Sequence, residues 1–300
     1  MTHEHAHHTH GPHQLRSLDR AFLLGIGLNI LFVAIEFGAG FWLHSLALLS
    51  DAGHNLTDVV SLALAMLAFR LARANPNPHY TYGYKKSTIL VSLVNAIILI
   101  VAVGGILVES LHKLEEPSPV DGSAIAWVAG VGVVINALTA LLFIREKERD
   151  LNVKGAYLHM AADALVSVGV LVSGVVIRFT GWYVIDPLIG LLVAVVIFIS
   201  SWGLLRDSIR LILDGVPSGI DGDRMLADIR ALPDVLDIHH VHIWAISTTE
   251  NALTAHVVLR RGASMQAAKQ RIREHLSTFG ISHATLEIES EGEHCQSEAD

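Results

Sequence analysis

Six long apolar stretches organise this chain, and they constrain its fold more than any other feature. Each is long enough to cross a hydrocarbon layer of about 30 Å as a helix, and segments with Pro, Gly or Asn separate several of them. Overall, 52% of the residues are hydrophobic and only 17% are charged, as is typical of integral membrane proteins. The sequence predicts an all-α bundle of six membrane helices, at about 17–41, 45–72, 85–112, 121–145, 152–178 and 184–212.

The polar ends of the chain form separate regions. We expect a His-rich disordered tail at 1–15, a transmembrane domain at 16–213, a cytoplasmic domain at 214–290 and a disordered tail at 291–300. Within the third region, helical and alternating patterns follow one another in the order αββαβ, which predicts a metallochaperone-like α+β fold. The expected elements are a helix at 222–231, strands at 235–247 and 252–259, a helix at 264–279 and a strand at 284–288.

Basic residues at the ends of the apolar stretches predict the orientation in the membrane, because cytoplasmic flanks carry the excess of Lys and Arg. One side has only Lys113 and Arg178. The other side has Arg16, Arg20, Arg70, Arg73, Lys85, Lys86, Arg145, Lys147, Arg149, Lys154, Arg206 and Arg210. We therefore expect a multi-pass protein of the cell (inner) membrane with both termini in the cytoplasm.

Two apolar stretches contain the same polar spacing, His54 with Asp58 and His159 with Asp163. Residues four apart lie on one face of a helix, so each stretch presents an imidazole and a carboxylate together. If the two helices face each other, two nitrogens and two oxygens form a tetrahedral ligand set suited to zinc. The alternative is two polar pairs that satisfy each other across a helix interface. Ionisable groups are costly at membrane depth, which favours an ion site.

Other polar residues allow more than one interpretation. Five of them could line a hydrated path or form interhelical hydrogen bonds: Asn29, Glu36, Asn95, Glu109 and Asn136. The first thirteen residues contain six histidines, His3, His5, His7, His8, His10 and His13, which indicate a tail that gathers metal at low affinity or a purification tag.

The C-terminal region offers a second candidate metal site. Four histidines fall on adjacent predicted strands, namely His239, His240, His242 and His256, and Glu287 and Glu289 fall on the last strand. Regular alternation places residues 240 and 242 on one face and residue 239 on the other. A metal site and ordinary surface histidines both remain open at this point.

Charge and motif content argue against several classes of function. From Asp214 onward there are fourteen acidic and seven basic residues, so this part carries −7 of the formal −8 charge and is unsuited to nucleic acid. A membrane metalloenzyme is a further alternative, but the chain has no His-Glu-x-x-His motif, and four protein ligands leave no open position for water. We therefore expect no enzyme activity.

Taken together, these motifs resemble the cation diffusion facilitator family, the divalent metal exporters related to bacterial cobalt-zinc-cadmium resistance transporters. The similarity covers nearly the whole chain. It rests on 45–58, on 82–86, on 159–163, on Asp186-Pro187 and on 239–244. The resemblance implies six membrane helices, a cytoplasmic αββαβ domain, a homodimer and exchange of cytoplasmic metal for external protons. Paired His-x-x-x-Asp motifs resemble the zinc-preferring branch.

The resemblance also assigns residues. It implies a transport site of His54, Asp58, His159 and Asp163, a charge interlock of Lys86 with Asp214, and a regulatory cytoplasmic site of His239, His256 and Glu289. Ser87-Thr88 departs from the family, in which many members have Ala-Glu.

We therefore predict a homodimeric transporter in the lipid bilayer that exports Zn²⁺ from the cytoplasm against protons by alternating access. Zinc is its substrate and a possible regulatory ligand. The alternatives are a metal-sensing membrane receptor and an exporter with a broader range that includes cadmium, cobalt and nickel.

Overall fold

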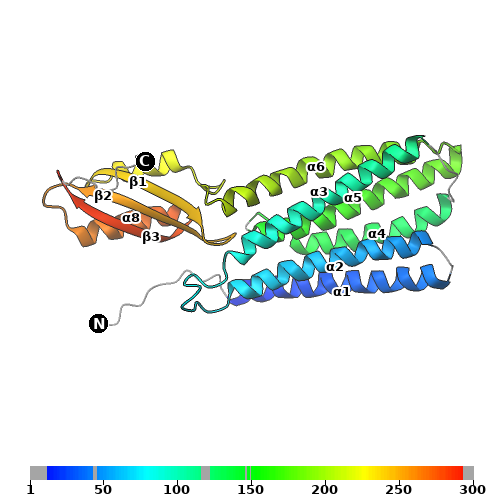
Figure 1. Ribbon diagram of the computed structural model, residues 1–300, viewed down its shortest axis with the longest axis horizontal. Helices are drawn as coiled ribbons and strands as arrows, with labels where there is room; N and C mark the ends of the chain where they lie inside the picture. The colour runs from blue at the N-terminus through cyan, green and yellow to red at the C-terminus, as the bar shows by residue number, and fades with distance from the viewer. Residues whose placement is uncertain (1–11, 43–45, 116–121, 146, 149, 293–300) are drawn as a thin grey trace.

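A computed structural model describes residues 12–42, 46–115, 122–145, 147–148 and 150–292. A bundle of long helices lies at one end of the molecule and an α+β domain at the other, so the two are arranged end to end (Figure 1). Helix α1 begins at the end of the bundle that faces the α+β domain (Figure 1). The predicted fold class is confirmed.

The six predicted membrane helices are present, with ends within several residues of those expected. Three described stretches are each long and apolar enough to cross a membrane, and they lie in α3, α5 and α6; shorter apolar stretches lie in α1, α2 and α4. The helices are α1 (Pro12–Trp42), α2 (Leu46–Ala72), α3 (Ser87–Glu115), α4 (Gly122–Phe143), α5 (Leu151–Thr180) and α6 (Ile185–Ile212).

Helix α5 has a defined cap at each end. Asp150 is the N-cap, with extended backbone and a carboxylate that accepts hydrogen bonds from the N–H groups of Asn152 and Val153. Such caps satisfy backbone donors that the first helical turn leaves without partners. At the other end Gly181 adopts φ 66°, a left-handed conformation that favours glycine, and its N–H donates to Ile177.

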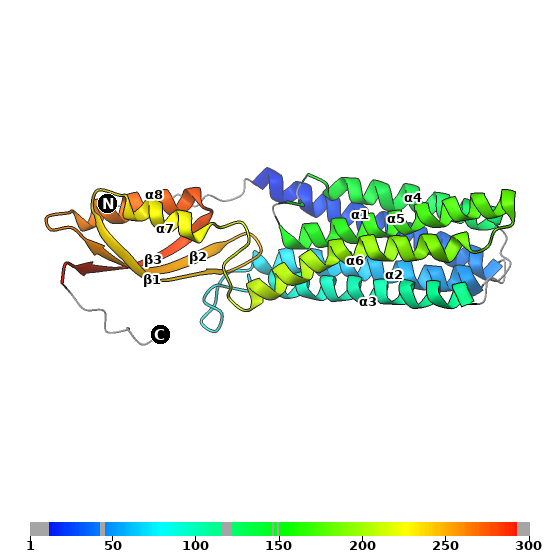
Figure 2. The same cartoon turned by 90° about the horizontal axis from the view of Figure 1, so that it is seen from above.

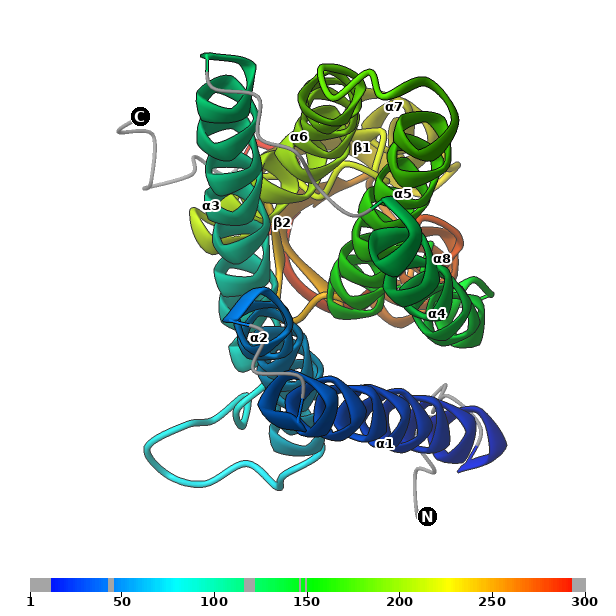
Figure 3. The ribbon, with the colours of Figure 1, turned by 90° about the vertical axis from the view of Figure 1, so that its right-hand side faces the viewer.

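The bundle is built from closely packed helix pairs. α1 packs on α2, α3 on α6 and α4 on α5, and α5 also contacts α2, α3 and α6. Figure 3 looks along the helices and shows α5 within this arrangement. A core between α1, α2, α4 and α5 contains Phe22, whose ring lies 4.9 Å from that of Phe143, together with Leu62 and Met160. This packing places α5 beside every other helix pair.

The C-terminal domain contains a sheet of order β1-β2-β3, in which β1 and β2 are antiparallel and β2 and β3 are parallel. Two helices cover one face of the sheet (Figure 2). Met225, Ile229, Leu253, Ile272 and Leu276 form the core between them. The elements are α7 (Gly222–Arg230), β1 (Val235–Ala245), β2 (Asn251–Leu259), α8 (Met265–Thr278) and β3 (Ile281–Ser290).

Element ends in this domain differ slightly from those expected, for local reasons. α8 begins one residue later because Ser264 is its N-cap and accepts a hydrogen bond from Ala267 N–H. β1 ends at Ala245 because the chain then turns. β3 is longer than predicted because pairing with β2 starts at Ile281 and continues to Ser290.

Candidate metal centres and the domain junction

The first candidate centre lies in α5. His159 Nε2 is 3.8 Å from Asp163 Oδ2, and the two side chains are 6% and 13% exposed. The predicted convergence of these groups on one helical face is present. His54 and Asp58 belong to α2, which packs against α5, but their side chains lie outside the described residues. The four-ligand set therefore stays a prediction.

Several asparagines of the bundle are buried. Asn29 donates to the Gly25 carbonyl, and its amide nitrogen lies 3.7 Å from the sulfur of Met160, the neighbour of His159. The side-chain oxygens of Asn29, Asn95 and Asn136 are buried without a hydrogen-bond partner among the described residues. Buried amides usually have hydrogen-bond partners, and water in a hydrated path would supply them. That path stays a prediction. The side chains of Glu36 and Glu109, which were also expected to line it, lie outside the described residues.

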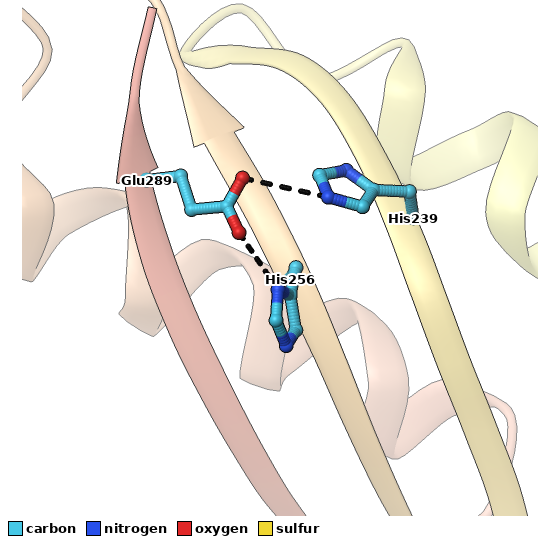
Figure 4. A group of neighbouring side chains, drawn as sticks. All are labelled: His239, His256 and Glu289. Atoms are coloured by element: carbon cyan, nitrogen blue, oxygen red, sulfur yellow. Dashed lines mark hydrogen bonds and ion pairs between the residues drawn. The ribbon is translucent and has the colours of Figure 1, made fainter. Parts of the chain in front are cut away.

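The second candidate centre lies on the sheet of the C-terminal domain. His239 on β1, His256 on β2 and Glu289 on β3 each offer one ligand atom, and these atoms lie within 4.8 Å of one another. The Glu289 carboxylate joins the two rings, with Oε1 2.7 Å from His256 Nδ1 and Oε2 3.4 Å from His239 Nε2 (Figure 4). Val257, next to His256, faces the helices, so the cluster lies on the opposite, uncovered face.

The expected placement of His239 on the face opposite His240 is wrong. The register shifts between His239 and His242, where His240 has a φ of 48°. This bulge inserts one residue, so both His239 and His240 have rings close to that of His256, with centroids 5.5 and 5.0 Å away. The bulge therefore concentrates imidazoles on one face of the sheet.

The donor set of this cluster suits a divalent metal. Two imidazole nitrogens and a carboxylate oxygen are ligands that zinc accepts, and three protein ligands leave a fourth tetrahedral position open. Glu287 lies beside the cluster, with Oε2 3.4 Å from His256 Nε2. The side chain of Glu289 is only 7% exposed, so water has little access to its carboxylate, whose partners are the two histidines.

The predicted charge interlock joins two helix ends. Lys86 Nζ lies 2.5 Å from Asp214 Oδ1, just before α3 and just after α6. Asp214 has a φ of 55°, its N–H donates to Leu211, and the N–H of Gly215 donates to Arg210. These bonds form a Schellman ending of α6, which sets the position of the Asp214 carboxylate.

Sequence reasoning missed Asp150, which lies where the two domains meet. Besides capping α5, its carboxylate accepts a hydrogen bond from the hydroxyl of Thr248, in the turn between β1 and β2. Only 6% of the residue is exposed. Burial raises the pKa of Asp150, while its hydrogen bonds to Thr248, Val153 and Asn152 act in the lowering direction. An aspartate just before an apolar helix is a sequence signal for an N-cap. Nothing in the local sequence indicates its contact with Thr248.

The histidines of the N-terminal tail, from His3 to His10, lie outside the described residues, as does the side chain of His13. The proposed metal-gathering role of the tail is therefore carried by sequence alone.

Comparisons with known proteins match both domains. The family described as "Cation efflux transmembrane domain" matches residues 22–213, and "Cation efflux protein, cytoplasmic domain" matches 217–291. The "Zinc transporter ZitB" of Escherichia coli is 35% identical, over 96% of this chain and 93% of its own length. The "Cadmium, cobalt and zinc/H(+)-K(+) antiporter" of Bacillus subtilis is 34% identical, over 87% and 85%. The "Cation efflux system protein CzcD" of Alcaligenes sp. is 34% identical, over 90% and 86%.

Proposed function

This chain belongs to the cation efflux family, also called the cation diffusion facilitators, and we propose that it exports zinc from the cytoplasm in exchange for protons. The observation that carries the proposal is the buried His159–Asp163 pair in the apolar helix α5. The names of the relatives support it, because one is a zinc transporter and another an antiporter for cadmium, cobalt and zinc.

Competition between metal and protons supplies the coupling. Zinc binds deprotonated carboxylate and neutral imidazole, so it competes with protons for the same atoms. Histidine changes protonation close to physiological pH. In the proposed cycle, zinc from the cytoplasm binds His54, Asp58, His159 and Asp163, the bundle then opens to the outside, and incoming protons displace the zinc.

The same proposal covers topology and assembly. We place both termini in the cytoplasm, because the basic residues gather at the helix ends near the C-terminal domain. The chain acts as a homodimer, in which the Lys86–Asp214 pair stabilises the cytoplasmic ends of α3 and α6. Zinc at His239, His256 and Glu289 regulates the geometry of that dimer. Residues 1–15 gather metal for the transport site.

Three alternatives are less well supported. A broader metal range is favoured by the relatives named for cadmium and cobalt, and imidazole with carboxylate does accept several divalent ions. A receptor or a metalloenzyme has no such support, because the family is one of cation efflux proteins.

The experiment that tests the function is zinc transport by Asp163→Ala in proteoliposomes with an imposed pH gradient. We expect zinc-for-proton exchange to fall to the background of empty liposomes, because the variant lacks one buried ligand. Asp237→Ala is the matched control, since it removes a carboxylate that is 53% exposed in the C-terminal domain, and it should transport at the wild-type rate. Wild-type exchange by Asp163→Ala would refute the proposed site.

A further inference from the structure

The turn between β1 and β2, formed by Ser247–Glu250, contacts two membrane helices at once. Glu250 forms an ion pair with Lys85, before α3, at 2.5 Å. The backbone N–H of Thr248 donates to the hydroxyl of Thr88 in the first turn of α3, at 3.1 Å. The Thr248 hydroxyl donates to Asp150, the N-cap of α5. The turn therefore bridges the ends of α3 and α5 that face the C-terminal domain.

Internal hydrogen bonds hold this turn in one shape. Ile246 N–H donates to the Glu250 carbonyl at 2.8 Å, and the Ser247 hydroxyl accepts from the N–H groups of Thr249 and Glu250 at 3.1 and 3.0 Å. At its base, Ala245 is fully buried against Ile89 and Leu211 of the bundle. These hydrogen bonds make the turn rigid, so a displacement of the sheet can be transmitted to the helices.

The bridged helices belong to different packing pairs, because α3 packs chiefly on α6 and α5 chiefly on α4. His159 lies nine residues after Asp150, which is about 13.5 Å along α5. A rigid helix carries a displacement of its first turn to that depth. In the proposed transport cycle this end of the bundle opens to the cytoplasm, and the contacts of the turn oppose a separation of α5 from α3 there.

We propose that Ser247–Glu250 is a clamp that holds the cytoplasmic ends of α3 and α5 together, with Asp150 as the positioning residue on α5. The clamp stabilises the conformation closed to the cytoplasm, and its release admits zinc. This inference rests on the proposed zinc transport. A cavity of about 410 Å³ adjoins the clamp and is lined, among others, by Asp150, Thr248, Lys154 and Asp207.

A clamp makes a kinetic prediction that a simple folding defect does not. When only a fraction of molecules is open to the cytoplasm, the apparent affinity for zinc from that side is reduced by that fraction. Weakening the clamp enlarges the fraction and lowers the apparent KM. A folding defect reduces the number of active molecules, so it lowers the maximal rate and leaves KM unchanged.

The decisive variant is Thr248→Val, which keeps the shape of the side chain and removes the hydroxyl donor. We expect KM for cytoplasmic-side zinc in proteoliposomes to fall by about threefold to tenfold, the range for one hydrogen bond. Thr248→Ser should restore the wild-type KM. Thr249→Val is the matched control, because among the described residues the hydroxyl of Thr249 forms a hydrogen bond only with Ser247 of the same turn. Its KM should stay at the wild-type value.

A second measurement needs no transport. Amide hydrogen exchange of the full chain in lipid nanodiscs should be faster in Thr248→Val than in Thr249→Val, specifically in the first turns of α3 and α5. An unchanged KM, an unchanged exchange rate, or equal effects in both variants would each overturn the clamp. A wild-type protein that carries no zinc would refute the proposed function, while the exchange comparison would still decide whether the turn holds the two helices.

Discussion

At the scale of single residues, Asp150 combines two requirements that conflict. As an N-cap it accepts backbone N–H groups at the positive end of the α5 dipole, which favours the ionised form. Its burial at the domain junction disfavours the charge, and this effect is the larger one, so its pKa is raised. The residue therefore makes the junction sensitive to pH.

The raised pKa predicts how stability depends on pH. Because the folded-state pKa lies above the unfolded value, the protonated carboxyl favours folding at low pH, and this contribution is lost as pH rises through the folded-state pKa. Asp150→Asn still caps α5 but carries no charge. We expect its melting temperature to exceed that of the wild type by a few degrees at neutral pH, and the difference to shrink as pH falls.

Thermal unfolding in detergent across a pH series measures this difference. Asp237→Asn is the control, because it makes the same substitution at a side chain that is 53% exposed and lies away from the domain junction. A constant difference for Asp150→Asn would contradict the prediction.

At the scale of elements, the end of α6 depends on close backbone approach. A Cβ added at Gly215 would lie 2.8 Å from Arg210 Cγ and 3.0 Å from the Arg210 carbonyl oxygen. Any side chain there disturbs the Schellman ending that positions Asp214 beside Lys86. The helix end and the ion pair are therefore one structural unit.

Gly215→Ala tests this unit. The overpacking should cost about 1–3 kcal/mol and lower the melting temperature. Gly219→Ala is the matched control in the same linker, since its added Cβ would meet no atom within 4 Å. Equal melting temperatures for the two variants would show that the structure accommodates a Cβ at Gly215, next to Arg210, without loss of stability.

Elements also show where sequence reasoning succeeded and failed. The six membrane helices were predictable because apolar length is a local property that the bilayer requires. The bulge at His240 could not be predicted, because the strand on either side of one inserted residue still has an alternating sequence pattern. That single residue changed which histidines share a face with His256.

At the scale of the whole molecule, one hairpin links the second candidate metal centre to the bundle. His239 and His256 lie on β1 and β2, and the turn that joins these strands is the proposed clamp on α3 and α5. A metal bound on the sheet would connect to the helix that carries His159 through the backbone of β1 and β2, the turn and the Thr248–Asp150 hydrogen bond. The proposed regulation by the C-terminal domain would act along this path.

Zinc should slow amide exchange in β1, β2 and β3 of the full chain, because it ties three strands together. It should also slow exchange in the turn Ser247–Glu250. His256→Ala should lose most of this protection, whereas His283→Ala, outside the cluster and beside Tyr82, should keep it. Hydrogen-exchange mass spectrometry with and without zinc measures both regions. Equal protection in the two variants would place zinc elsewhere.

The amino-acid sequence by itself determined the membrane bundle, the α+β domain and the His-x-x-x-Asp pairs, because hydrophobic periodicity and ligand spacing are local patterns. Tertiary structure decided what local patterns cannot encode. It brought Glu289 between His239 and His256 across three strands, and it brought Thr248 to Asp150 across 98 positions of the chain. Such contacts depend on strand register and domain docking, which arise only when the whole chain packs.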